Sequence, residues 1–182
     1  NLSYLNNNSS SGSYTKLTYQ FTNENRDYIE YPLNGYYFQI EMSKYLEGKS
    51  PINHFEIIGH TEKHFQLKNR LFLGSSIKGK WSSPGYQPYF AQIGLGFDDY
   101  IRGYEYYVID GQKFWLTKTI LKYAIVKKTN FNIPYVKMKQ FNKSHYSLYL
   151  GLFSDMGHVI DSQTYQNNNL SNQFLLGNGI SI

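Results

Sequence analysis

Three histidines and two glutamates alternate along one short stretch and are the residues best suited to bind a metal ion. They are His54, Glu56, His60, Glu62 and His64, and in a β-strand all five side chains share one face. Ligands from a single strand rarely converge on one ion, and the order His-Thr-Glu-Lys-His differs from the helical motif of zinc proteases. We therefore expect no metal here and interpret these residues as a polar wall.

No other pattern predicts a catalytic or cofactor site. Gly94 and Gly96 form too short a glycine motif for a dinucleotide loop, since no third glycine or following helix is predicted. The sequence has no Gly-x-Ser-x-Gly nucleophile elbow, and its lack of cysteine excludes a disulfide scaffold and a thiolate metal site. We predict that the protein is not an enzyme and has no cofactor.

The charge pattern argues against nucleic-acid binding. The net charge is +5 at pH 7, and the basic residues lie in turns or alternate with apolar neighbours instead of forming a concentrated stripe. No segment has the roughly 18 apolar residues of a transmembrane helix, and no signal peptide is recognisable. A membrane role would have to come through β-strands.

Tyrosine is unusually abundant for a chain of such polar character. Aromatic residues make up 18% of the sequence, with 19 tyrosines, while the mean hydropathy is -0.53. Tyrosine collects where one end of a side chain is apolar and the other is wet, as in the aromatic girdles of membrane barrels. Composition alone also fits a tyrosine-rich extracellular β-sandwich.

Alternation of apolar and polar residues recurs along almost the whole chain and predicts about seven β-strands. Many of them reach the roughly 9 to 11 residues that a tilted strand needs to cross a bilayer, which favours a membrane barrel over a sandwich. The predicted strands lie around residues 17–21, 36–43, 55–62, 70–81, 115–125, 146–153 and 174–182.

The predicted connections fall on two sides of such a sheet. If residues 66–69 form a tight periplasmic turn, then the connections 46–53, 82–112 and 161–172 all face outward, as the long loops of this class do. The link 128–144 would be an unusually long periplasmic turn, and residues 23–34 form the remaining connection.

The long connection and a later strand carry two motifs of a known family. Gly94-Leu95-Gly96-Phe97 is followed by a run of five residues, and the strand contains Phe153-Ser154-Asp155-Met156-Gly157. The run is Ile101, Arg102, Gly103, Tyr104 and Glu105. Together these motifs resemble the lumen-loop signature and the Phe-x-Asp-x-Gly strand of the BamA/TamA outer-membrane assembly proteins, a superfamily of bacterial surface antigens.

The resemblance implies that Arg102 lies inside the barrel and pairs with Asp155. The strand pattern agrees independently, because Asp155 shares a face with Tyr149 and Gly151 and lies opposite the stripe of leucines. A planar guanidinium binds a carboxylate in bidentate fashion, so this pair would pin the long loop against the wall. One position departs from the family, since Ile120 replaces a glutamate that usually also contacts the arginine; Glu105 or Asp110 is the candidate substitute.

A third motif is weaker. Arg26 and Asp27 precede Tyr31-Pro32-Leu33-Asn34-Gly35, which is similar to the Tyr-Pro-x-x-Gly turn before a strand in these barrels. Proline fixes φ and glycine supplies a positive φ, so Tyr31, Pro32 and Gly35 predict a tight periplasmic turn. The three motifs occur in family order from about Tyr14 onwards.

We therefore expect an all-β chain, residues 1–182 forming part of one antiparallel transmembrane β-barrel of about sixteen strands with a long lumen loop. We expect sequence to be missing on both sides, including the last strands. The implied location is the bacterial outer membrane, and the implied function is insertion or transport of outer-membrane proteins. Its partners would be lipid, unfolded client proteins and accessory envelope proteins or lipoproteins, without nucleic acid.

Three alternatives stay open at this point. A related barrel secretes a passenger or anchors a patatin-like lipase, which the missing N-terminal region would distinguish. A plain porin or adhesin barrel has no arginine-to-aspartate clasp of the loop. A secreted β-sandwich would be soluble without detergent.

Overall fold

Seven long β-strands make up almost all of the regular structure in the computed structural model. It describes residues 13–46, 53–85, 87–96, 98–132, 143–162 and 169–182. The strands are β1 (Thr15–Arg26), β2 (Gly35–Leu46), β3 (Phe55–Lys68), β4 (Leu71–Ser83), β5 (Lys113–Asn132), β6 (Lys143–Ile160) and β7 (Phe174–Ser181). One short 3-10 helix, η1 (Tyr89–Ala91), lies between β4 and β5. The prediction of an all-β chain with seven strands is confirmed.

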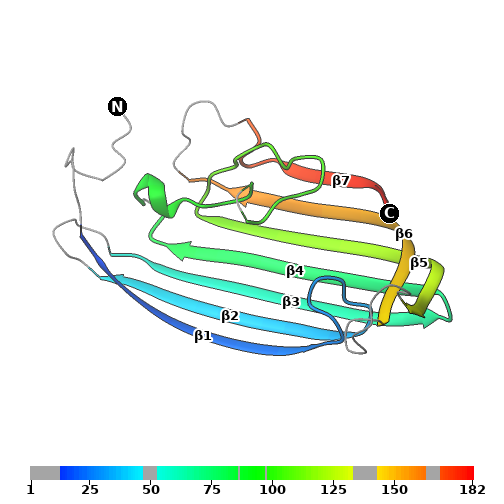
Figure 1. Cartoon of the computed structure of the whole chain (residues 1–182). Coiled ribbons are helices and arrows are strands. Elements are labelled where there is room, and N and C mark those ends of the chain that lie inside the picture. Colours follow the sequence, from blue (N-terminus) through cyan, green and yellow to red (C-terminus); the bar gives the residue numbers. More distant parts are fainter. Residues whose placement is uncertain (1–12, 47–52, 86, 97, 133–142, 163–168) are drawn as a thin grey trace.

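The strands form one curved, open sheet in which each strand pairs antiparallel with its sequence neighbours (Figure 1). The order is β1-β2-β3-β4-β5-β6-β7, without a crossover. Within the described residues, the outer edges of β1 and β7 pair with no other strand. Successive connections therefore alternate between the two ends of the sheet, as the hairpin pattern predicts.

The outer face of the sheet is apolar although it is exposed. Its large side chains are Leu17, Tyr19, Phe21, Phe38, Met42, Phe65, Ile77, Trp81, Trp115, Tyr123, Leu148, Leu150, Leu152, Met156, Phe174, Leu176 and Ile180. A water-soluble protein rarely exposes so large a continuous apolar surface. The sheet is thus patterned with its apolar side chains outward.

The inner face carries most of the polar and charged side chains. Strand register places them side by side: Lys16, Gln20, Glu24 and Arg26 of β1, Gln39, Glu41 and Ser43 of β2, Glu56, His60, Glu62 and His64 of β3, Ser76, Lys78 and Lys80 of β4, Lys118 and Lys122 of β5, and Asp155 of β6. Successive side chains of a strand point to opposite faces of the sheet, so the alternation of apolar and polar residues in the sequence is enough to place the apolar side chains outward and the polar ones inward.

The long connection between β4 and β5, residues 84–112, folds back onto the inner face (Figure 1). An isolated bridge between Leu95 and Ile109 holds its two arms together. Their apolar side chains join those of the wall in a small buried core, which consists of Leu95, Ile101, Ile109, Phe114, Leu116, Val159 and Leu175. This core seats the loop against β5, β6 and β7.

Several strands continue into segments that the sequence predicts as connections. The link at 128–144 was expected to be a long turn, but β5 continues to Asn132 and β6 begins at Lys143, which leaves 133–142 outside the described residues. Likewise β1 continues to Arg26, into the segment predicted as a connection. The ladder continues because backbone hydrogen bonds do not require apolar side chains. A tight turn does join β3 and β4, but it lies at Asn69 and Arg70 instead of 66–69, because β3 continues to Lys68 and β4 starts at Leu71.

Other parts of the predicted connections also lie outside the described residues, namely 47–52 and 163–168. In the described part of the chain, no helix has the length and apolar character needed to cross a membrane.

Candidate functional site: the clasp between loop and wall

The structure brings Arg102 of the long loop and Asp155 of β6 together. The guanidinium forms a fork, with Nε donating to Oδ2 at 2.7 Å and Nη2 donating to Oδ1 at 2.5 Å. The backbone amide of Arg102 adds a third bond to Oδ2 at 3.1 Å. Asp155 is 0% exposed, and the guanidinium also stacks at 3.7 Å over the Phe153 ring. Charge-assisted bidentate bonds of this kind are strong and directional.

Two wall glycines make room for the loop beside this clasp. A Cβ at Gly177 of β7 would lie 2.0 Å from the Arg102 carbonyl oxygen, and one at Gly157 of β6 would lie 2.9 Å from Cδ1 of Ile101. The Ile101 side chain, which is fully buried, fits into the resulting notch. The glycine of the Phe-x-Asp-x-Gly motif, Gly157, is therefore needed because its lack of a side chain leaves room for Ile101. Gly177, which makes room for the Arg102 backbone, was not identified from the sequence.

The Gly103 backbone has a different role. Its φ of +96° lies in the left-handed region, and a Cβ built there would meet nothing within 4 Å. Glycine is thus needed for the turn after Arg102 and not for close passage along the wall. Tyr104 completes the turn by donating its amide to the Ile101 carbonyl at 2.8 Å, and its ring packs against the buried core.

Glu105 points back to the turn and not to the arginine. Its Oε2 accepts the Gly103 amide at 2.9 Å, and this hydrogen bond holds the pKa of Glu105 below its usual range. Asp110 lies further along the loop, where burial raises its pKa, although a hydrogen bond with Tyr89 acts in the opposite direction. At the position of the expected wall glutamate, Ile120 instead packs against Gly74 and Gly151.

Two lysines of β4 hold the first arm of the loop, and sequence reasoning did not single them out. Lys80 is buried; its Nζ donates to the carbonyls of Ala91 at 3.1 Å and Ile93 at 2.9 Å, and it pairs with Glu56 at 3.1 Å. Lys78 pairs with Asp99 at 2.7 Å. Their only signal in the sequence is that they share the inner face.

The second arm is held where it joins the sheet. Ser82 donates its hydroxyl to the Gln112 carbonyl at 2.6 Å, and Gln112 donates its side-chain amide to Asp161 at 2.9 Å. The loop is thus fixed to β4 at its base and to β6 through Arg102. Between wall and loop lies a cavity of about 320 Å³ lined by charged groups that include Lys16, Glu41 and Asp99.

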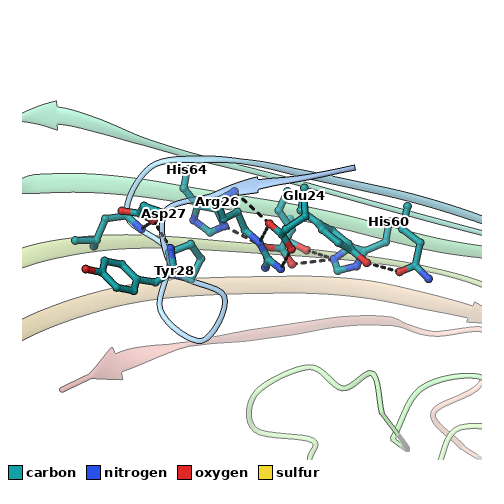
Figure 2. Close-up of polar contacts among 12 residues, drawn as sticks. Glu24, Arg26, Asp27, Tyr28, His60 and His64 are labelled. Carbon is teal, nitrogen blue, oxygen red and sulfur yellow. Dashed lines mark hydrogen bonds and ion pairs between the residues drawn. The ribbon is translucent and has the colours of Figure 1, made fainter. Parts of the chain in front are cut away.

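His60, Glu62 and His64 of β3 form an ion-pair network with β1 (Figure 2). The other two residues of the histidine and glutamate stripe lie elsewhere, since Glu56 pairs with Lys80 and His54 stacks on the Tyr45 ring just before β3. The Glu62 carboxylate accepts Arg26 Nη1 at 2.8 Å and lies 3.1 Å from His60 Nε2 and 3.0 Å from His64 Nε2. Arg26 binds Glu24 as well, with Nε 2.7 Å from Oε1. Among the described residues, no group of three or more histidine or acidic side chains is arranged to hold a metal ion.

The turn motif before β2 is not a tight reversal. Residues 27–34 form the connection, and Gly35 begins β2 with a φ of +110°, where a Cβ would lie 2.0 Å from the Asn25 carbonyl oxygen. Tyr31 and Pro32 turn inward and contact β5, where Lys122 Nζ donates to the Pro32 carbonyl at 2.9 Å. Gly35 thus has the predicted conformation, but the turn is wider than expected.

Comparison with models of protein families, with curated proteins and with solved structures finds no match to this chain. The groups described above bind and orient a loop inside a curved wall. Their chemistry is that of positioning: bidentate pairing, carbonyl binding by lysine, and close packing on glycine.

Proposed function

We propose that the chain is part of an outer-membrane β-barrel of the BamA/TamA type, which inserts and assembles other outer-membrane proteins. The apolar outer face supports contact with lipid, since a barrel in a membrane exposes apolar residues outward and polar residues to its lumen. The described strands have 8 to 20 residues, and six of the seven exceed the roughly 9 to 11 needed to cross a bilayer.

The observation that carries the assembly function is the bidentate pair between Arg102 and Asp155. The lumen of a plain channel can be filled by water alone, whereas here a charged clasp fixes a long loop to the inner wall. Here the clasp joins both motifs that resemble the assembly family, and the buried core beside it seats the same loop against β5, β6 and β7. In such a barrel a seam opens sideways and its free strand edge templates an incoming strand by β-augmentation.

The test is a folding assay in lipid vesicles with the full-length protein. A small outer-membrane barrel, unfolded in urea, is diluted into vesicles with or without the reconstituted protein, and its folding is followed by gel mobility without heating. We expect faster folding of this client in the vesicles that contain the protein. An equal rate in both, with the protein folded in the bilayer, would contradict the assembly function and favour a porin, an adhesin or a passenger-bearing barrel.

A further inference from the structure

The connection between β1 and β2 crosses the inner face of the sheet. It comprises residues 27–34, here called the strap, and it contacts β5 and β6 while β3 and β4 lie between (Figure 1). The strap lies at the end of the sheet opposite to the base of the long loop, because successive connections alternate in an antiparallel sheet. A two-residue turn would suffice to join β1 and β2, so the longer path needs an explanation.

Lys122 of β5 is the main anchor of the strap. Its buried Nζ donates to the Pro32 carbonyl at 2.9 Å and lies 3.7 Å from the centre of the Tyr31 ring. A lysine ammonium over an aromatic face gains electrostatic attraction, the more so when it is shielded from water. One ammonium thus holds both the backbone and a side chain of the strap.

Further contacts bind the strap to the far strands and keep its shape. The Tyr31 ring packs at 5.2 Å on the Tyr149 ring of β6, and Lys128 Nζ donates to the Tyr28 hydroxyl at 2.6 Å. Within the strap, Asp27 Oδ1 accepts the amides of Tyr28 at 3.0 Å and Leu33 at 2.9 Å. These bonds make the strap an ordered inward fold.

The strap and the long loop approach each other inside the sheet. A cavity of about 350 Å³ is lined by Ile29 and Pro32 of the strap, by Tyr100 and Arg102 of the loop, and by the wall between them. A second cavity of about 380 Å³ lies beneath the strap, beside Phe72 and Asn69. Two connections that enter from opposite ends therefore fill the inner side of the sheet together.

We propose that the strap is a gate that closes one end of the barrel interior, with Lys122 as its positioning residue. The inference rests on the proposed membrane barrel and goes beyond it, since it concerns passage through the lumen and not client folding. When the Lys122 contacts are lost, the only hydrogen bond left between the described residues of the strap and β5 is the exposed one from Lys128, and the interior opens at that end.

The test is ion conductance of the full-length protein in planar bilayers, with Lys122→Met compared with wild type. Methionine keeps the apolar stem but neither donates nor attracts the Tyr31 ring. We expect conductance to rise severalfold in Lys122→Met and to be unchanged in the control Lys127→Met, whose lysine on the same strand binds Asn69 instead. Equal conductance in wild type and Lys122→Met would overturn the gate.

A crosslink keeps the proposal falsifiable if Lys122→Met does not fold. The Tyr31→Cys, Tyr149→Cys double variant lacks the ring contacts of Tyr31 with Lys122 and Tyr149, so its conductance should rise. A short bis-maleimide should join the strap to β6 and return the conductance to the wild-type level. Conductance that does not change on crosslinking, or no crosslink in a folded, membrane-inserted protein, would overturn the gate. Failure of the barrel itself has a different signature: the protein would not insert into bilayers at all, even if the crosslink formed in detergent.

Discussion

At the scale of single residues, the clasp joins a fully buried carboxylate to a guanidinium that is only partly exposed. Asp155 is 0% exposed and accepts three hydrogen bonds, all from Arg102. Removal of the guanidinium leaves this buried carboxylate with one hydrogen bond, from the backbone amide, although Lys118 lies opposite it on β5. Such a loss is far costlier than loss of an exposed pair.

We therefore expect Arg102→Met to destabilise the protein by about 3 kcal/mol, the lower end for a broken buried pair because Arg102 retains some solvent contact. Lys78→Met is the matched control; it breaks a loop-to-wall pair whose side chains are 24% and 23% exposed, and its cost should be about 1 kcal/mol or less. The urea midpoint of unfolding, followed by Trp fluorescence, measures both. Equal shifts in the two variants would show that the Arg102–Asp155 pair stabilises the protein no more than the partly exposed Lys78–Asp99 pair does.

At the scale of elements, the loop lies so close to β7 that the wall has no room for a methyl group at Gly177. The Arg102 carbonyl occupies the place where a Cβ would be. A Cβ added at Gly59 on β3 would meet nothing within 4 Å. Replacement of Gly59 by alanine therefore tests the intrinsic effect of alanine in a strand.

Gly177→Ala should displace the loop and destabilise its seat by about 1 to 3 kcal/mol, whereas Gly59→Ala should stay within about 0.5 kcal/mol of wild type. The measurement is limited trypsin digestion after Arg102, because this bond becomes accessible once the loop leaves the wall. Faster cleavage is expected in Gly177→Ala alone. If both variants are cleaved at the wild-type rate, the close approach does not hold the loop.

The elements also show what the sequence can and cannot predict. Side-chain period fixes the face of each residue, so the number of strands, the inner position of Asp155 and the sides of the connections follow from the pattern. The strap does not, since its path depends on Lys122, which lies 90 residues from Pro32 in sequence. The lysines of β4 were equally hidden, because alternation shows which face a side chain lies on but not which carbonyl it reaches.

At the scale of the whole molecule, the outer face determines which environment the sheet needs. Ile77 lies near the middle of β4 and is 52% exposed, in a continuous apolar band. In water, arginine at this position would be harmless. In a bilayer it would cost about 2 to 4 kcal/mol near the midplane.

We expect Ile77→Arg to lower the free energy of unfolding of the protein in vesicles, measured by urea titration, by an amount in that range. Thr22→Lys on the exposed inner face of β1 is the control and should change stability by less than about 1 kcal/mol, since a charge on this polar face stays hydrated. A soluble sandwich predicts the reverse outcome for Ile77→Arg, with no loss of stability and no need for lipid.

Nearest-neighbour pairing also bears on how such a wall changes in evolution. Each hairpin is a complete unit of the ladder, so gain or loss of one alters the width of the sheet without changing the pairing order of the other strands. The clasp lies wholly within β4 to β7 and its loop, whereas the strap ties the first hairpin to β5 and β6. Loss of the first hairpin would leave the clasp intact, and the strap would be lost with it.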